Sequence, residues 1–284
     1  EIKTSKDDIE DFSFKNVNKI AFEKSGLKYE VTGIEENVSS FTKDEILEYY
    51  KKHYTPKNSL ITMVSPLSHE DAIKLVEKNF GMWKGEKPEN LPIIKEDNKE
   101  IKKVSYKKDL EQSTIVYLYT FNNLTKDDEL PLRILNHRLG ESANSLLFRE
   151  VRENRGLAYD IYTHLEITNN IKTLYIYTAV SDENIEEAEN AINTTLKNII
   201  DGKIQIGEKD LNIMKKVHKT AVISTLEDSA ELCNYMLHQD LEGEDIYEFL
   251  KDMDRLNTLY VDKINKVAKE VLKKPTIHIL KPER

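Results

Sequence analysis

Three arginines and a tyrosine lie close together in residues 149–159. Arg149, Arg152 and Arg155 come near the end of an apolar helical stretch, and Tyr159 belongs to the strand expected after the turn at Gly156. Positive side chains near the C-terminal end of a helix interact favourably with its dipole. Residue types and spacing alone therefore favour electrostatic capping of that helix, with a binding role for the guanidinium groups as the alternative.

The histidines offer no local metal site. No two of them lie four residues apart, and the sequence has no HExxH, HxxEH, HxH or HxxxH pattern. A zinc-binding helix presents two ligands one turn apart, so a local histidine pair cannot build such a site here. His69 precedes two acids and is interpreted as the start of a helix that Ser68 caps. His278 lies in an apolar run and is interpreted as a core residue of a strand.

Composition excludes several classes of protein. The chain has 284 residues, with 42 Lys+Arg against 51 Asp+Glu and a net charge of −9. The acidic balance argues against non-specific nucleic-acid binding. No apolar run approaches the ~20 residues of a membrane span. The single Cys233 excludes an internal disulfide and a cysteine zinc site, and we expect it to be a small core residue.

Hydrophobic periodicity predicts the elements that would position these side chains. A capping box, Thr42 followed by Glu45, begins a helix expected over residues 41–54. Residues 60–64 (LITMV) are interpreted as a short buried strand, and a further helix is expected from Ser68. Later strands are expected over residues 113–120, 158–167, 173–180 and 276–280. Later helices are expected over 130–151 with an interruption at Gly140, and over 181–200, 208–226, 229–237 and 258–272.

The end of the chain repeats an earlier pattern. Residues 42–64 and 258–280 both contain a Thr start, a Lys-rich amphipathic helix, a proline and a short apolar strand, at a constant offset. Such a recurrence indicates a duplicated unit of about 200 residues. The chain also begins at Glu1 without an initiator Met. Both observations predict that the first copy lacks its N-terminal part.

The segment from Leu139 to Tyr159 resembles a signature of the M16 peptidases, the inverted zincins that include insulin-degrading enzyme, pitrilysin and the mitochondrial processing peptidases. The signature reads roughly L-G-x-x-x-x-S-x-L-F-x-x-[IV]-R-E-x-x-G-L-A-Y. The matching residues are Leu139, Gly140, Ser145, Leu147, Phe148, Val151, Arg152, Glu153, Gly156, Leu157, Ala158 and Tyr159. Residues 42–64 resemble the helix, H-Y-x-P-x-N and strand segment of the family's first half, so the resemblance covers nearly the whole chain.

The resemblance implies an α+β fold made of two tandem halves, each a mainly antiparallel sheet covered by helices, with the first half incomplete. Residues 1–85 would be the C-terminal part of the first half, and residues 101–284 the second half. Residues 86–100, which contain two prolines and show little apolar periodicity, are predicted to link them.

The resemblance also implies zinc. Members of the family bind zinc through an HxxEH helix and through a Glu farther along the chain, and Glu1 falls on the position of that third ligand. The two histidines and the catalytic Glu are absent from this sequence. We therefore expect zinc in the full-length parent, no zinc bound to this chain, and no activity of this chain by itself.

Arg152 and Tyr159 have the seven-residue separation of the family's Arg and Tyr that reach the substrate carbonyl. A guanidinium and a phenol both donate hydrogen bonds to a developing oxyanion. In this family the substrate peptide is held as an added strand at a sheet edge and is hydrolysed in a closed chamber, with zinc-bound water as the nucleophile and the HxxEH Glu as general base.

Two hypotheses about function follow. The chain is either the C-terminal two-thirds of a zinc-dependent endopeptidase, or part of a non-catalytic M16-like subunit that binds peptide or an active M16 chain. We expect a peptide or unfolded polypeptide as substrate and a homodimer or an M16 partner chain, with no nucleic acid and no membrane as partners. A single cysteine weakly favours a reducing compartment, hence the cytoplasm.

Overall fold

The computed structural model describes residues 1–283, and their contacts group them into two compact units. The first comprises residues 1–33, 93–218 and 254–283, and the second comprises residues 34–92 and 219–253. The first unit contains a five-stranded sheet with the strand order β1-β5-β2-β4-β3. All neighbouring pairs are antiparallel except β1 and β5. The strands are β1 (Ile101–Lys107), β2 (Ser113–Thr120), β3 (Ala158–Ile167), β4 (Lys172–Val180) and β5 (Thr276–Pro282).

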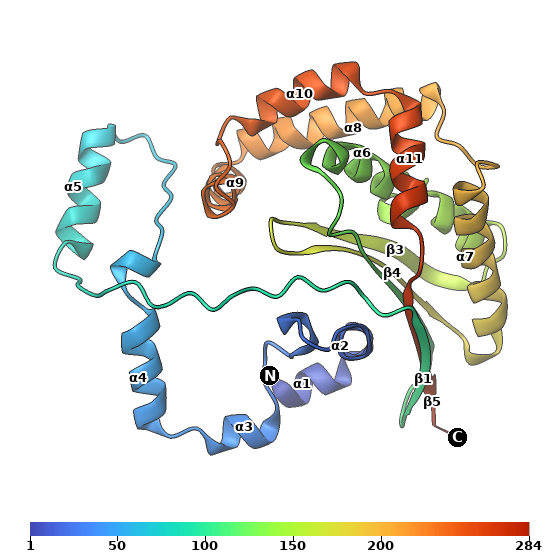
Figure 1. Cartoon of the computed structure of the whole chain (residues 1–284), viewed down its shortest axis with the longest axis horizontal. Helices are drawn as coiled ribbons and strands as arrows, with labels where there is room; N and C mark the ends of the chain where they lie inside the picture. Colours follow the sequence, from blue (N-terminus) through green and yellow to red (C-terminus); the bar gives the residue numbers. More distant parts are fainter. Residues whose placement is uncertain (284) are drawn as a thin grey trace. The chain divides into compact units, whose positions relative to one another are not determined.

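Strand β2 lies in the middle of the sheet because its residues are β-branched or aromatic and suit two buried faces. All but the last of its residues are buried. One face carries Ile115, Tyr117 and Tyr119 and is covered by helices α6 (Lys126–Asn136), α7 (Ile185–Ile200) and α11 (Val261–Val271) (Figure 1). The Tyr117 hydroxyl donates a hydrogen bond to Oδ1 of Asn193 on α7, at 2.9 Å. This polar contact fixes α7 against the sheet.

The opposite face of the sheet is covered by helix α2 (Ile9–Ala21), which follows the short helix α1 (Ile2–Asp7). Val17 and Ala21 of α2 are fully buried in a cluster with Val116 and Leu118 of β2. The hydroxyls of Ser13 and Thr114 are 2.7 Å apart within this interface. The amino-terminal helices therefore belong to the core of the first unit, although the sequence analysis assigned no element to residues 1–33.

Within residues 1–283, all of the regular secondary structure of the second unit is helical. They are α3 (Glu35–Ser40), α4 (Lys43–His53), α5 (His69–Phe80) and α9 (Ser229–Leu241). Helices α8 (Glu208–Glu227) and α10 (Glu248–Thr258) each have one end in this unit. The predicted capping box of Thr42 and Glu45 is confirmed at the start of α4. Ser68 caps α5 through the N–H of Asp71, as predicted.

The strand predicted over residues 60–64 is wrong, because these residues form no strand. Leu60 and Ile61 are 42% and 48% exposed. An apolar run becomes a strand only where another strand satisfies its backbone groups, and the described part of the second unit supplies none. The second member of the repeat does pair, as β5. Cys233 is half-buried, with its Sγ 3.0 Å from the Thr62 hydroxyl, and is not a core residue.

One helix prediction is corrected near its start. The expected helix over residues 258–272 begins at Val261, after the N-cap Tyr260, and Thr258 instead ends α10. The helical material expected over residues 130–151 is interrupted just after Gly140, as predicted: α6 and the π-helical turn His137–Glu141 precede the break, and the π-helical turn Phe148–Glu153 follows it. The remaining predicted strands are confirmed, and so is the α+β class with a mainly antiparallel sheet covered by helices.

Residues 84–100 form no helix or strand, but their last part is anchored to the first unit. The Glu96 carboxylate accepts hydrogen bonds from the backbone N–H groups of Glu23, Lys24 and Ser25. The Asn98 side chain bonds to Thr120 of β2. None of the helices described in residues 1–283 is long and apolar enough to cross a membrane.

Candidate functional site

The candidate site is built around the turn that connects the second π-helical turn to β3. Ser145 is fully buried, and its hydroxyl accepts a hydrogen bond from the Phe148 N–H at 3.3 Å. Leu147 and Val151, on either side of Phe148, are also fully buried and anchor the turn in the core. Gly156 then adopts φ +64°, a left-handed conformation that favours glycine. This geometry directs the chain from the helical turn into β3.

The guanidinium of Arg152 contacts two aromatic rings. Its Cζ lies 4.8 Å from the ring centroid of Phe148 and 4.7 Å from that of Tyr159. These distances are within the ~6 Å at which a cation is attracted to a ring face. The side chain is partly buried, and its N–H groups have no carboxylate or carbonyl partner among residues 1–283. The structure thus brings together the two residues that the signature resemblance selected.

The neighbouring arginines differ from Arg152 in this respect. Arg155 donates to Glu150 at 2.8 Å and to Glu187 at 3.4 Å, and Arg149 lies 4.0 Å from the Glu153 carboxylate. The hydrogen bonds from Arg155 hold the pKa of Glu150 below its ordinary value. The charges of Arg149 and Arg155 are therefore paired with carboxylates, whereas Arg152 keeps its donors available.

Tyr159 projects into solvent because β3 is bulged at that residue. The pairing of β3 with β4 aligns Ala158 with Val180 and Asp160 with Ala179, so Tyr159 is the extra residue between them. A bulge of this kind re-aims a side chain and disrupts the ladder locally. The Tyr159 side chain is 79% exposed. Its phenol is therefore accessible to a ligand beside the Arg152 guanidinium.

Glu1, the predicted third zinc ligand, lies in the first unit at the N-cap position of α1 and is exposed. Its backbone carbonyl accepts a hydrogen bond from the Ser5 N–H at 2.8 Å, and its side chain makes no capping hydrogen bond. Within residues 1–283 no three His, Cys, Asp or Glu side chains come together in a way that could hold a metal ion. The role of Glu1 stays a prediction.

A second feature near β3 was missed by the sequence analysis. An open groove of about 450 Å³ lies between α2 and the strands β3 and β4. It is lined by Asp8, Glu10, Asp11, Phe14, Tyr162, His164 and Tyr175. The signal in the sequence was Asp8 as an N-cap, followed by acids in the first helical turn and by Phe14, Val17 and Ala21 at helical spacing.

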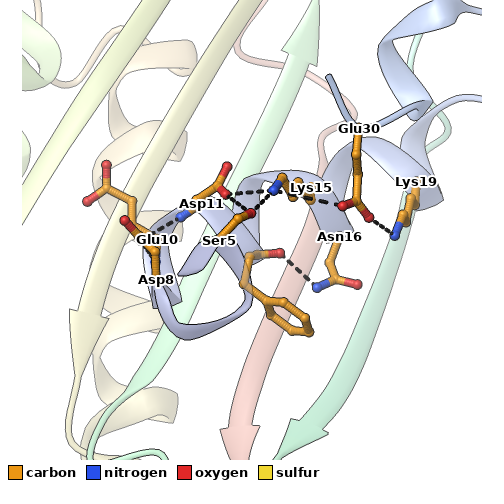
Figure 2. A network of polar contacts seen from close by, with 9 residues as sticks. Ser5, Asp8, Glu10, Asp11, Lys15, Asn16, Lys19 and Glu30 are labelled. Atoms are coloured by element: carbon orange, nitrogen blue, oxygen red, sulfur yellow. Dashed lines mark hydrogen bonds and ion pairs between the residues drawn. The ribbon is translucent and has the colours of Figure 1, made fainter. Parts of the chain in front are cut away.

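Carboxylates dominate the charge of this groove. The Tyr162 hydroxyl donates to Oε1 of Glu10 at 2.5 Å, and burial together with this acceptor raises the pKa of the Tyr162 phenol. Burial acts to raise the pKa of Asp11, but hydrogen bonds from Lys15 and Ser5 hold it below its ordinary value. Figure 2 shows Lys15 between Asp11 and Glu30, with Ser5 beside it. Lys15 thus partly compensates the acidic side chains.

His278 is a core residue, as predicted. It is 1% exposed, and its Nε2 lies 2.6 Å from the Ser105 hydroxyl on the neighbouring strand. Burial, aided by the nearby Lys103, lowers the pKa of His278 to about 4. The imidazole is therefore neutral at physiological pH and belongs to the sheet interior.

Comparisons with known proteins agree on one family. The family model described as the peptidase M16 inactive domain matches residues 40–217. The uncharacterized zinc protease YmxG of Bacillus subtilis is 27% identical over 276 residues, which are 95% of this chain and 65% of YmxG. The zinc protease PqqE of Helicobacter pylori is 24% identical over 88% of this chain and 57% of its own length. The chain thus spans less than two thirds of these curated relatives.

Solved structures share the fold. A protease from Helicobacter pylori superposes with a TM-score of 0.86 at 18% identity, covering 96% of this chain and 67% of that one. The peptidase M16 inactive domain from Pseudomonas fluorescens superposes with a TM-score of 0.86 at 16% identity, covering 99% of this chain and 67% of the other. At these identities the likeness establishes the architecture, and function has to be argued from side chains.

Proposed function

The chain belongs to the peptidase M16 family, and from this premise we propose that it forms part of a zinc-dependent endopeptidase in which Arg152 and Tyr159 bind the peptide carbonyl. The observation that carries the proposal is the accessible pair itself. Arg152 keeps its donors free of carboxylates while Tyr159 presents an exposed phenol 4.7 Å away, measured from guanidinium carbon to ring centroid. Both groups are donors and suit an oxygen acceptor.

The role of the two side chains is to stabilise negative charge. When a peptide bond is attacked, its carbonyl oxygen gains charge, and donors already in place stabilise that charge without reorganisation. A guanidinium supplies a permanent positive charge and several N–H groups in one plane, and the phenol adds an O–H. Removing one such donor commonly lowers kcat by about 10²–10³-fold.

The residues present do not form a zinc site. The sequence contains no HxxEH, and Glu1 has no His, Cys or acidic neighbours that would complete a metal-binding group in residues 1–283. Hydrolysis would therefore need ligands and a general base from polypeptide outside this chain. We infer that this chain alone binds no stoichiometric zinc and cleaves no peptide.

The substrate would be an extended peptide running past β3. This strand is the outermost member of the sheet next to β4, and Tyr159 lies at its start. An extended peptide can pair with the edge of a sheet through main-chain hydrogen bonds. The groove lined by Asp8, Glu10 and Asp11 lies beside the same strand, which favours peptides without acidic side chains at that point.

Two observations support the second candidate function, a non-catalytic subunit that binds peptide or pairs with an active M16 chain. The matching family model is described as an inactive domain, and residues 1–283 contain no group of side chains that could hold a metal ion. The two proposals differ in the sequence encoded upstream of Glu1. An HxxEH helix there supports the peptidase, and its absence from the reading frame overturns it.

The test is peptide hydrolysis by the full-length protein. A quenched fluorescent peptide library is incubated with the wild type and with Arg152→Gln, Tyr159→Phe and the matched control Arg149→Gln. We expect kcat to fall by about 10²-fold or more for Arg152→Gln, with Arg149→Gln close to the wild type because its partner Glu153 is exposed. Equal rates for Arg152→Gln and Arg149→Gln would contradict the assignment.

A further inference from the structure

We propose that Phe148 is a positioning residue for Arg152. Its ring, together with that of Tyr159, holds the guanidinium so that the N–H groups stay available to a peptide carbonyl. The effect of Phe148 on catalysis rests on the proposed function. The contact between Phe148 and Arg152 is a property of this chain and does not depend on it. Phe148 touches Arg152 and would act through it.

The spacing of the two residues makes the contact possible. Phe148 and Arg152 are four positions apart on one helical turn, where such pairs are neighbours on the same side. The 4.8 Å separation of Cζ and ring centroid is nearly the same as the 4.7 Å separation from the Tyr159 ring. The guanidinium is therefore in contact with two rings that come from different elements.

The backbone of Phe148 is fixed independently of Arg152. The Ser145 hydroxyl accepts its N–H, and Leu147 and Val151 are fully buried on either side. The ring itself is partly buried, which leaves part of it exposed to the Arg152 side chain. A ring on an anchored turn restricts a long flexible side chain that would otherwise sample many rotamers in solvent.

The chemistry of the neighbour matters as much as its position. A carboxylate beside Arg152 would accept its N–H groups, as Glu150 and Glu187 do for Arg155, and would compete with a substrate oxyanion. A phenyl ring attracts the cation through its face and accepts no strong hydrogen bond. The N–H groups of a guanidinium lie in its plane. Aromatic contacts therefore restrain the charge without consuming its donors.

The first part of the test measures the contact between the Arg152 guanidinium and the Phe148 ring directly and needs no activity assay. In the full-length protein labelled with ¹⁵N-arginine, the Arg152 Nε–Hε resonance is identified by its loss in Arg152→Lys. Aromatic ring currents should move it away from the position of solvent-exposed arginines. We expect Phe148→Leu to shift it towards that position, Phe148→Tyr to retain it, and the exposed control Phe41→Leu to leave it unchanged. An unchanged resonance in Phe148→Leu overturns the proposal.

The second part of the test measures the consequence by a double-mutant cycle on kcat/KM for a peptide. We expect Phe148→Leu to lower kcat about 10-fold with little change in KM, and Phe148→Tyr to restore most of it. On the Arg152→Gln background, Phe148→Leu should have no further effect. An equal loss on both backgrounds would indicate a merely structural role and overturns the proposal. If Arg152→Gln itself leaves kcat/KM unchanged, the proposed function fails, and the resonance measurement still decides the positioning.

Discussion

The guanidinium carbon of Arg152 lies 4.7 Å from the ring centroid of Tyr159, although the two residues belong to a π-helical turn and a β-strand. Three local features produce this proximity: the π-helical turn, the positive φ of Gly156, and the bulge that leaves Tyr159 unpaired in the ladder. π-helical turns and bulges both recur near functional sites because they re-aim side chains. The contribution of Gly156 can be tested by substitution.

Gly156→Ala should destabilise the protein by about 1 kcal/mol, because an L-residue with a Cβ is strained in the left-handed region. A Cβ at this position would meet no atom within 4 Å. The loss of stability would therefore come from the backbone strain at φ +64° rather than from a clash with another residue. Urea denaturation measures the change in the free energy of unfolding. Gly156→Asn is the matched control, since asparagine tolerates this conformation. The free energy of unfolding of Gly156→Asn should be closer to that of the wild type. An equal decrease for both variants would contradict this explanation.

Gly140→Ala should be more damaging than Gly156→Ala, by about 2–3 kcal/mol relative to the wild type. A Cβ at Gly140 would lie 2.5 Å from Cγ2, 2.7 Å from Oγ1 and 2.8 Å from the backbone N of Thr163 on β3. The neighbouring atoms belong to a buried strand residue and cannot easily move. The same denaturation series compares the two alanine variants. A smaller loss for Gly140→Ala than for Gly156→Ala would show that this packing is adjustable.

Stability should decrease as the pH falls through the titration of His278. Its folded pKa is about 4 against an ordinary 6.5, so the folded state favours the neutral imidazole. As the pH falls, His278 binds a proton at a higher pH in the unfolded state than in the folded state. The stability that the neutral imidazole contributes above pH 6.5 is therefore lost as the pH falls towards 4. Between about pH 7.5 and about pH 5 the loss from this group is about 2 kcal/mol.

His278→Gln isolates this effect from other titrating groups. Glutamine can keep a hydrogen bond with the Ser105 hydroxyl but does not titrate. The free energy of unfolding of the two proteins, measured by urea denaturation at several pH values, should therefore converge as the pH falls. Parallel curves would mean that His278 has similar pKa values in the folded and unfolded states.

The sheet was the most predictable part of the fold. Residues 113–120 and 173–180 are β-branched and aromatic runs, and such runs pack well in a buried sheet. Residues 60–64 have the same character but form no strand, because pairing depends on a neighbouring strand and cannot be read from one segment. Helix α1 offered little signal because it has six residues, none of them buried. Helix α2 was missed although its N-cap Asp8 and the helical spacing of Phe14, Val17 and Ala21 indicate it.

The proximity of the two residues selected for the candidate site agrees with their spacing, but their electrostatic surroundings could not be predicted. Spacing and the family resemblance selected Arg152 and Tyr159, and the structure places them in contact. The difference between Arg152 and Arg155 could not be predicted, because Glu187 reaches Arg155 from α7, a helix that lies beyond two strands in the sequence. Which arginine keeps its donors free is a property of the tertiary fold.

Asn98 should contribute to stability although it lies in the segment predicted to be a linker. Its Nδ2 donates to the Lys274 carbonyl at 3.0 Å and to the Thr276 hydroxyl at 3.2 Å, and its Oδ1 accepts from the Thr120 N–H at 2.9 Å. It thereby joins the start of β5 to the end of β2. Asn98→Ala should lower the free energy of unfolding by about 1–2 kcal/mol, because partly buried partners lose their hydrogen bonds.

Asn90→Ala is the matched control for Asn98→Ala. Asn90 lies in the same segment but is exposed and belongs to no helix or strand. We expect a change within about 0.5 kcal/mol for this variant, as for most surface substitutions. Both are measured by urea denaturation monitored by far-UV circular dichroism. Equal and small changes at the two positions would mean that the anchoring of residues near Asn98 does not contribute to the fold, and that the whole of residues 86–100 behaves as a linker.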